Sequence, residues 1–330
     1  MCVLFQKIQP EGAYQQYKKY RERFPFTGPK GRILSFEGID GADVYNTSIP
    51  FTLDGREIIA ARVEPRSSER SRTMFFYKDG DRCSLILNAP VLDLQDPFIA
   101  WIGGELVVGG VSVDWTPEEK LITYRTRFYR GKTLQELHYF TEGPDRMKDI
   151  RLIQLPNGRV GVFTRPQGKP MLERFGCIAK IGFDIVDSLE EINPGIIDHS
   201  PLLEGHFLPE EWGGCNQIYN LSNGLLGIIG HKSWGEMTGS VKIIHYYCMA
   251  FAMDPQTRWM SPVKVIAARE DYPEGPQKNA RAMDVAFSSG IVRLGNGRAE
   301  MYTGLSDCQE GILDIEDPFD EYEQWKMQEK

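Results

Sequence analysis

The chain has 330 residues, a formal net charge of −8 and a sequence pI near 5.3, with 33 glycines, 20 prolines and 11% aromatic residues. This composition is typical of a turn-rich globular protein and excludes collagen-like, low-complexity and disordered chains. Because the Lys and Arg residues of this acidic chain are scattered, we expect no nucleic-acid binding, which needs a contiguous basic surface.

No apolar run approaches the roughly 18 residues that a membrane-spanning helix needs. The first residues, MCVLFQKIQPEG, also lack a secretory signal, so we expect no membrane contact and a cytoplasmic location. The six cysteines lie far apart and form no Cys-x-x-Cys pair. We therefore expect reduced, mostly buried thiols and no metal site, and the chain carries no cofactor-binding fingerprint.

Two segments at the ends of the chain, residues 10–24 and 317–330, are predicted to be helical. We expect these extensions to brace the rim of the domain. The alternative is that they join two copies of the chain in a homo-oligomer.

Between these helices, five tight-turn dipeptides each separate two apolar runs and predict β-hairpins with two-residue turns. The dipeptides are Asp54-Gly55, Gly103-Gly104, Asn157-Gly158, Asn223-Gly224 and Asn296-Gly297. The strands after these turns are predicted at 58–63, 105–111, 159–165, 225–231 and 298–304.

The hairpins carry polar residues at matching positions. Seven residues after the turn glycine stand Arg62, Arg165 and His231 in three of the five copies. Eight or nine residues before it, four copies have a short polar residue: Asn46, Asp96, Asp149 and Asn216. Because the outgoing and returning strands cover similar distances, each polar residue is expected beside the returning side chain. The fifth copy offers Asp284 or Asp307, and its register stays open.

The repeat predicts a β-propeller. Its starting residues are spaced by 50, 53, 67 and 68 positions, and several short strands per unit at such a period are typical of propeller blades. We predict an all-β, five-bladed β-propeller, a single domain over residues 1–330 with short N- and C-terminal helical extensions. The blades are expected at roughly 33–88, 89–145, 146–198, 212–269 and 278–319. Since the first strand of each blade lines the axis, the polar residues would meet at one end of the channel.

Successive segments of the chain, from about residue 44 to 319, resemble the blades of glycoside hydrolase family 130. These segments are YNTSIPFTLDGREIIAARVE, QDPFIAWIGGELVVGG, MKDIRLIQLPNGRVGVFTRP, NGLLGIIGHKSW and AFSSGIVRLGNGRAEMYTGLSD. Members of that family are five-bladed propellers that cleave or build β-mannosides, mostly by phosphorolysis. In its short length and its QDPF motif, the chain is most similar to the mannosyltransferase/phosphorylase relatives that turn over β-1,2-mannan reserves.

The resemblance implies a role for each polar residue. Asp96, in the Asp-Pro motif, would be the general acid. The residues expected to bind the sugar are Asn46, Arg62, Gln95, Asp149 and Asp307. Lys148 of the Lys-Asp motif, Arg165 of the Arg-Pro motif and His231 would form a cationic phosphate site. The sequence departs from the family at Phe98, where an Arg usually follows Asp-Pro.

The predicted function is an inverting phosphorylase that acts on β-mannosides, mainly β-1,2-linked, and forms α-mannose 1-phosphate. Phosphate is already a nucleophile, so one carboxylic acid and a set of cations suffice, whereas an inverting hydrolase also needs a base. Transfer from GDP-mannose is a related activity, because a site for a sugar 1-phosphate can be extended to a sugar nucleotide. The expected partners are therefore a β-mannooligosaccharide and phosphate, a sugar 1-phosphate or GDP-mannose.

Other readings stay open at this point. An inverting hydrolase would use Asp149 or Glu69 as the base, and a propeller that only binds carbohydrate would use neither. Asp96 could make a local turn hydrogen bond, the two arginines could bridge blades, and His231 could be a core residue. The loop at 64–72 is a solvated loop, or it closes over the channel with Arg66, Arg70 and Arg72.

Overall fold

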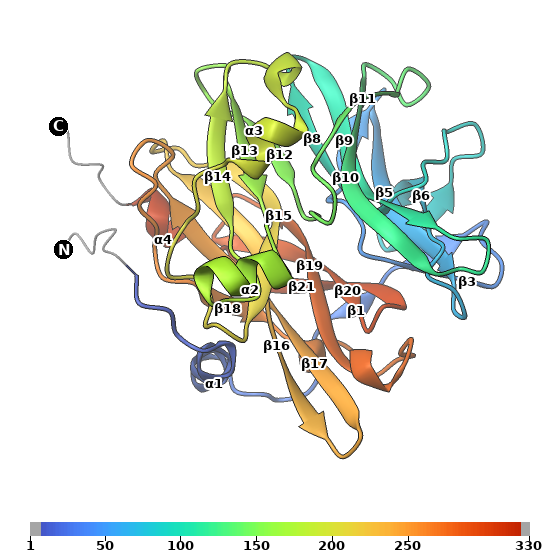
Figure 1. The fold of residues 1–330 in the computed structure, drawn as a ribbon. Coiled ribbons are helices and arrows are strands. Elements are labelled where there is room, and N and C mark those ends of the chain that lie inside the picture. The colour runs from blue at the N-terminus through green and yellow to red at the C-terminus, as the bar shows by residue number, and fades with distance from the viewer. Residues whose placement is uncertain (1–7, 325–330) are drawn as a thin grey trace.

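The computed structural model describes residues 8–324 and consists mostly of β-strands, as predicted (Figure 1). Hydrogen bonds join the strands into four sheets.

The first three sheets use separate stretches of the chain. The first has the order β2-β7-β6-β5-β3, with β4 beside β5. Its strands are β2 (Ser35–Glu37), β3 (Ala42–Tyr45), β4 (Phe51–Leu53), β5 (Arg56–Pro65), β6 (Arg72–Asp79) and β7 (Arg82–Leu85). The second is formed by β8 (Gln95–Ile102), β9 (Glu105–Trp115), β10 (Leu121–Gly131) and β11 (His138–Glu142). The third is formed by β12 (Arg151–Gln154), β13 (Val160–Thr164) and β14 (Gly182–Val186).

The fourth sheet has eight strands and combines two antiparallel sets. One set is β15 (Trp212–Asn220), β16 (Leu226–Thr238), β17 (Val241–Met253) and β18 (Lys264–Ala267). The other is β19 (Asp284–Arg293), β20 (Arg298–Leu305), β21 (Gln309–Glu316) and β1 (Arg32–Ile33). A short parallel contact between β17 and β19 joins the two sets, and β1 from the start of the chain pairs with β21 near its end.

The sheets follow one another around the molecule in a closed circle of contacts (Figure 1). Strand β8 lies against β5 and β12, β15 against β12 and β19, and β3 against β20 and β21. A cavity of about 340 Å³ is lined by Ile49, 99–101, 152–154, 217–220 and Arg293, which belong to or flank the first strands of the sheets. The space between these first strands is called the axial hollow below. The cavity forms one end of it, and none of the predicted site residues lines the cavity.

The core lies between neighbouring sheets. Apolar runs such as Val160–Thr164 are buried at every position, because both faces of an inner strand are covered. The five cysteines within the described part of the chain are free and buried, as predicted, while Cys2 lies outside it.

The predicted hairpin strands are confirmed, but the turn type is right in only two of five cases. Asp54-Gly55 and Gly103-Gly104 have positive φ at both residues and form two-residue turns. The other three connections are three-residue loops, at 156–158, 222–224 and 295–297, each closed by backbone hydrogen bonds between the flanking residues. In each of these loops the final glycine has a positive φ, as does Gly295 in the last one, whereas the asparagine before the final glycine does not and accepts a backbone N–H instead.

Four α-helices and three 3-10 turns complete the described chain. The helices are α1 (Ala13–Arg23), α2 (Lys169–Phe175), α3 (Pro194–Asp198) and α4 (Asp320–Glu323), and the turns span Leu189–Glu191, Arg269–Asp271 and Ala280–Ala282. The predicted N-terminal helix is confirmed, and α4 is the start of the C-terminal one, whose residues 325–330 lie outside the described part. Within residues 8–324, every helix is too short or too polar to cross a membrane.

Helix α1 is held to the fourth sheet by a fully buried lysine. Lys232 on β16 donates to the carbonyl oxygens of Glu11 (2.5 Å) and His206 (2.8 Å), and its Nζ lies 3.2 Å from Oε2 of Glu211. Glu211 also accepts the backbone N–H of Ala13, the first residue of α1. The contacts that Lys232 and Glu211 make with the start of α1 thus support the bracing role predicted for this helix.

We predict that Lys232→Met lowers the free energy of unfolding by about 3–5 kcal/mol, because it leaves Glu211 buried without its cation. Urea denaturation of the full chain measures the change. The matched control is Lys169→Met, whose side chain is 84% exposed and which should change stability by only about 0.5 kcal/mol. Equal losses in the two variants would contradict the proposed anchor.

Candidate active site

Four polar residues stand at the rim of the axial hollow in a left-handed backbone conformation. The φ angles are 46° at Asn46, 50° at Asp96, 58° at Asp149 and 56° at Asp307. Asn and Asp are the residues that adopt this conformation most readily after glycine. Three of the four are the starting residues predicted from the repeat. The fourth predicted one, Asn216, instead sits where the pairing of β15 with β16 is interrupted by a bulge.

Asp96 is buried and accepts two hydrogen bonds on its Oδ1 atom, from Nδ2 of Asn46 (2.7 Å) and from Nη1 of Arg62 (3.0 Å). Burial alone would raise the pKa of this carboxyl. Arg62, Lys148 and the hydrogen bond from Asn46 outweigh burial and hold the pKa of Asp96 below its usual value. Asn46 and Arg62, which were expected to lie side by side in the first blade, thus both donate to the carboxylate of Asp96.

Arg62 is fixed by residues that the sequence analysis missed. Its Nε and Nη2 atoms donate to Oε2 of Glu64 at 3.1 and 2.8 Å, and the guanidinium lies 4.8 Å from the ring centroid of Tyr45. Glu64 is fully buried and also accepts from Tyr45 (2.5 Å) and from Lys278. The sequence feature that could have identified Glu64 is its position two residues after Arg62, which places both side chains on one face of a strand.

The open register of the fifth copy is now decided in favour of Asp307. Burial raises the pKa of Asp307 to about 6; Arg62 lowers it, and the nearby Asp96 raises it. Asp284 lies elsewhere, with Oδ2 2.5 Å from Nδ1 of His245. Asp307 therefore lies with Arg62 and Asp96 on one side of the hollow.

The third and fourth sheets build the other side around Asp149. Its Oδ2 atom accepts from Nη2 of Arg165 at 2.5 Å and lies 3.8 Å from Nε2 of His231. Burial opposes ionisation, but Arg165, Lys148 and the other cations hold the pKa of Asp149 far below its usual range. Lys148, which is half-buried, acts on both Asp96 and Asp149 and so lies between the two halves of the site.

The pKa of His231 is lowered well below physiological pH, which favours a neutral ring over the cation that we expected. Its ring is buried between Tyr246 (5.4 Å between centroids) and Phe287 (4.7 Å), and this burial lowers its pKa to about 3 despite the opposing effect of Asp149. Its Nδ1 atom lies 2.7 Å from Oδ1 of Asn216. The structure therefore brings His231 to the site as a neutral hydrogen-bonding group.

Arg151 is a further buried cation that the sequence analysis missed. Its Nη2 atom lies 3.9 Å from Oδ1 of Asp149, and its Nε donates to the carbonyl of Asn216 at 2.9 Å. The guanidinium lies 4.7 Å from the ring centroid of Phe98. Phe98 itself is packed in the core between the second and third sheets, so the departure from the Asp-Pro-Arg pattern does not place an aromatic ring in the hollow.

Several buried polar atoms around the hollow have no hydrogen-bond partner among the described residues. They are Oδ1 of Asn46, Oδ1 of Asp149, Nε of Arg165 and Nδ2 of Asn216. Such atoms are uncommon in folded proteins because each one costs free energy. These four atoms are therefore available to a polar ligand.

Two glycines allow the close approach of these side chains. A Cβ atom at Gly304 would lie 1.8 Å from Oδ1 of Asn46, and one at Gly214 would lie 3.3 Å from Oδ2 of Asp149. Gly304 stands at the position where other copies of the repeat have Arg62 or His231. Glycine is therefore required in the fifth copy to leave room for Asn46.

The loop at 64–72 is held through its backbone by residues near Asp96 and Glu64. Nε2 of Gln95 donates to the carbonyl of Glu69 (2.9 Å), and Nζ of Lys278 donates to that of Ser68 (2.8 Å). The structure does not bring the loop arginines to the site, because they pair with outer carboxylates. These pairs are Arg66 with Asp43, Arg70 with Glu119 at 3.3 Å and Arg72 with Asp93 at 3.9 Å.

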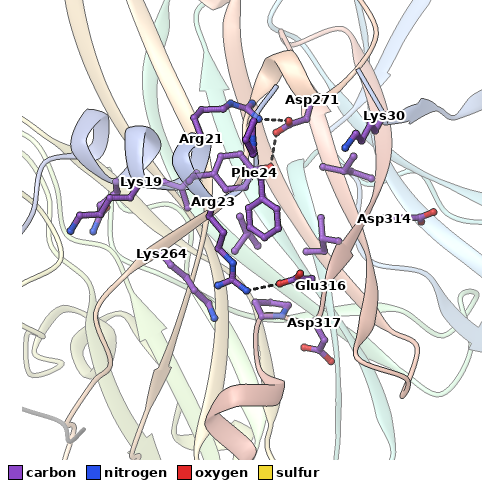
Figure 2. A pocket seen from close by; sticks show the side chains of 18 of the residues that line it. Lys19, Arg21, Arg23, Phe24, Lys30, Lys264, Asp271, Asp314, Glu316 and Asp317 are labelled. Atoms are coloured by element: carbon purple, nitrogen blue, oxygen red, sulfur yellow. Dashed lines mark hydrogen bonds and ion pairs between the residues drawn. The ribbon is translucent and has the colours of Figure 1, made fainter. Parts of the chain in front are cut away.

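The larger cavity of the molecule, about 820 Å³, contains none of the predicted site residues (Figure 2). It lies between α1, residues 24–30 and the end of β21. Its charged side chains are largely paired with one another, as in Arg21–Asp271 (2.7 Å) and Arg23–Glu316 (2.6 Å). The cavity of about 340 Å³ contains none of the predicted site residues either. The polar residues predicted from the repeat contact one another instead, as Asp96 does with Asn46 and Arg62.

Comparison with known proteins agrees with this geometry. A family described as "Protein of unknown function (DUF1861)" matches residues 26–321, which is most of the chain. The chain belongs to the DUF1861 family. No curated protein matches this DUF1861 member.

Solved structures similar to this DUF1861 protein include two enzymes from Leishmania mexicana. One is MPT-4, a mannose phosphorylase in complex with phosphate ion, at 37% identity and a TM-score of 0.84 over 95% of this chain and 96% of that chain. The other is MPT-1, a GDP-Man-dependent mannosyltransferase, at 36% identity and a TM-score of 0.82 over 92% of this chain and 94% of that chain. The predicted resemblance to mannosyltransferase/phosphorylase relatives is confirmed.

A β-1,2-mannobiose phosphorylase from Listeria innocua shares the fold, with a TM-score of 0.57 at 17% identity over 84% of this chain and 92% of that chain. The fold is therefore one that propeller-type enzymes use.

We predict that the imidazole of His231 stays neutral from pH 7 to pH 5, since its pKa is lowered to about 3. The value in an unfolded chain is about 6.5, so the stability contributed by the neutral ring is present above pH 6.5 and decreases as the pH falls. Phosphate should raise this pKa, because a nearby dianion favours the imidazolium.

Imidazole ¹⁵N chemical shifts report the protonation state, and His231→Gln identifies the signal by its loss. A ring that titrates near pH 6.5 without any added anion would show that the burial of His231 does not control its charge.

Proposed function

We propose that this protein is an inverting β-mannoside phosphorylase that converts β-1,2-linked oligomannosides and phosphate into α-mannose 1-phosphate and a shortened acceptor. The observation that supports the proposal is that Lys148 acts on both Asp96 and Asp149, so that Asp96 lies near the cations that surround Asp149. The similarity to a mannose phosphorylase and a mannosyltransferase supports it.

The division of the fold into five blades belongs to the same proposal. We take residues 33–88, 89–145 and 146–198 as the first three blades, and 212–269 and 278–319 as the two halves of the eight-stranded sheet. The short parallel contact that joins β17 to β19 supports this division, because each half is otherwise antiparallel within itself. We also keep the cytoplasmic location as an expectation.

The two sides of the hollow suit the two substrates. The sugar side has two cations, Arg62 and Lys278, and three carboxylates: Glu64, Asp96 and Asp307. Carboxylates and the Asn46 amide are the groups that accept and donate hydrogen bonds with sugar hydroxyls. The opposite side has one carboxylate, Asp149, and three cations: Lys148, Arg151 and Arg165. An excess of cations in a buried site attracts a phosphate dianion.

In the proposed reaction, a phosphate oxygen forms a bond to the anomeric carbon while the bond to the glycosidic oxygen breaks. The leaving oxygen gains a proton, which comes from Asp96 directly or through a sugar hydroxyl. The lowered pKa of Asp96 works against this role in the empty site. Binding of phosphate supplies negative charge nearby, which raises the pKa of a carboxyl group and favours its protonated form.

Transfer of mannose from GDP-mannose is the second activity that we propose for the same residues. The reaction runs from the phosphate side to an acceptor on the Asp96 side, as in the reverse of phosphorolysis. The similarity of the chain to both a phosphorylase and a GDP-Man-dependent enzyme favours keeping the two activities together.

A hydrolytic mechanism is less favoured by the geometry. A base must gain a proton from water, but Asp149 is paired with Arg165 and its pKa is held far below the usual range. The other candidate, Glu69, has a side chain that is 56% exposed and pairs with Arg62 (3.4 Å) and Lys278 (3.4 Å). A propeller that only binds carbohydrate would leave the cationic side without a role.

We predict that Asp96→Asn lowers the rate of phosphate release from α-mannose 1-phosphate and mannose by about 10²-fold or more. Asn fits the left-handed backbone at this position, so the loss would reflect the missing acid rather than the fold. The control is Asp187→Asn, an exposed carboxylate paired with Arg159, which should retain full activity.

The same assay separates the alternatives. Cleavage of β-1,2-mannobiose without phosphate would identify a hydrolase, and binding of the sugar without any turnover would identify a binding protein. Full activity of Asp96→Asn would rule out the acid assigned here.

We further predict that Gly304→Ala lowers kcat/KM on the order of 10²-fold, because a Cβ atom displaces the Asn46 amide from Asp96. The loss should equal that of Asn46→Ala, and the double variant should be no worse than either single one. Additive losses would mean that the glycine acts on activity through some contact other than Asn46.

A further inference from the structure

We infer that an aromatic wall on the fourth sheet, formed by Tyr246 and Trp212, binds the nucleoside part of a nucleoside diphosphate sugar. The inference rests on the proposed function and names residues that would let one phosphate site accept both a sugar 1-phosphate and a sugar nucleotide.

The wall begins at the phosphate side of the hollow. Trp212, Ser233 and Tyr246 are paired across β15, β16 and β17, and His231 lies two rows further along the same ladder. Residues two apart on neighbouring strands share a face of the sheet, so His231, Tyr246 and Trp212 form one continuous surface. The rings of His231 and Tyr246 are stacked at 17°, and the ring centroids of Tyr246 and Trp212 are 6.0 Å apart.

This surface leads away from the hollow. His231 is buried beside Asp149, whereas Tyr246 and Trp212 are partly exposed. Beyond them the β16–β17 hairpin projects from the body of the protein (Figure 1). A ligand held at Asp149 and Arg165 can therefore extend along the wall toward solvent.

The stereochemistry decides which part of a ligand meets the wall. Inversion requires the acceptor and the phosphate to lie on opposite faces of the anomeric carbon. Asp96 marks the acceptor face, and the cations around Asp149 mark the phosphate face. The part of the ligand that extends past His231 is thus the group bonded to the phosphate. In a sugar nucleotide this group is the nucleoside phosphate.

The polar groups of the wall suit that ligand. The indole Nε1–H of Trp212 donates to the hydroxyl of Tyr246 at 2.8 Å, and indole nitrogen can only donate. The hydroxyl proton of Tyr246 is therefore free to bind a phosphate or ribose oxygen, since residues 8–324 provide no second partner for it.

The wall also has a cation and a flat apolar surface. Nζ of Lys242 lies 5.6 Å from the ring centroid of Trp212, and in the described chain this lysine forms no ion pair. Aromatic side chains bind nucleobases by stacking, a contact that does not depend on the identity of the base.

The test compares two donors with the same acceptor, mannose, in the full chain. The ratio of kcat/KM for GDP-mannose to kcat/KM for α-mannose 1-phosphate should fall about ten-fold or more in Trp212→Leu. Tyr246→Phe, a milder change, should lower the ratio in the same direction. Calorimetry with GDP alone should show weaker binding to both variants, independently of turnover.

The matched control is Trp234→Leu on the same hairpin. Trp234 lies on the other face of the sheet, where it stacks on His245 (4.3 Å) and contacts Tyr14 (5.8 Å). This variant should leave the ratio of the two donors unchanged even if it lowers stability.

The outcomes separate this inference from the function on which it rests. An unchanged ratio in Trp212→Leu overturns the inference alone. A wild-type protein that turns over α-mannose 1-phosphate but neither uses GDP-mannose nor binds GDP overturns the inference and the proposed transfer from GDP-mannose, and leaves the phosphorylase activity intact. A loss that depends on the length of the acceptor, with both donors affected equally, makes the wall an acceptor site and also overturns it. Failure to use α-mannose 1-phosphate at all overturns the proposed function.

Discussion

The site depends on the left-handed backbone conformation of the residues that precede or begin the inner strands. In an extended strand, successive side chains point alternately to the two faces, and both faces of an inner strand here are covered by neighbouring sheets. A residue with φ near 50° leaves that alternation and can direct its side chain into the axial hollow. This conformation costs most residues about 1–2 kcal/mol, and Asn and Asp tolerate it best. The same constraint therefore fixes both the position and the chemical type of Asn46, Asp96, Asp149 and Asp307.

Burial and the neighbouring charges then give the two sides of the site different electrostatic properties. Asp96 and Asp149 are buried and Asp307 is partly buried. Burial by itself would favour the protonated form of each carboxyl, and the cations around it oppose this effect. Asp149, enclosed by cations, is firmly ionised, whereas Asp307, with one arginine and a neighbouring carboxylate, has a pKa of about 6. An acidic protein with a net charge of −8 can thus present a local excess of positive charge where a phosphate dianion is expected to bind.

Much of this arrangement could be predicted from the sequence because it repeats. The turn glycines located the hairpins, and the spacing from each glycine placed Arg62 beside Asn46 and Arg165 beside Asp149. The loop type could not be read from Asn-Gly, because a two-residue turn and a three-residue loop both accept that pair. Glu64, Arg151 and Lys278 were missed because their roles arise from contacts between sheets, on which the repeat carries no information. The positive charge expected for His231 was not predictable for the same reason. The burial that lowers its pKa comes from Tyr246 and Phe287, which belong to other strands.

The pairing of β1 with β21 has a consequence for biosynthesis. The two strands are separated by nearly the whole chain, and the contact between Asn46 and Gly304 spans a similar interval. Contacts between such distant residues form late, because the intervening chain must be ordered first. A nascent polypeptide on the ribosome has a continuous run of earlier sheets but no closed ring. Until the last hairpin emerges, the hollow lacks one wall, and a truncated translation product would carry the acid at residue 96 without a complete sugar site.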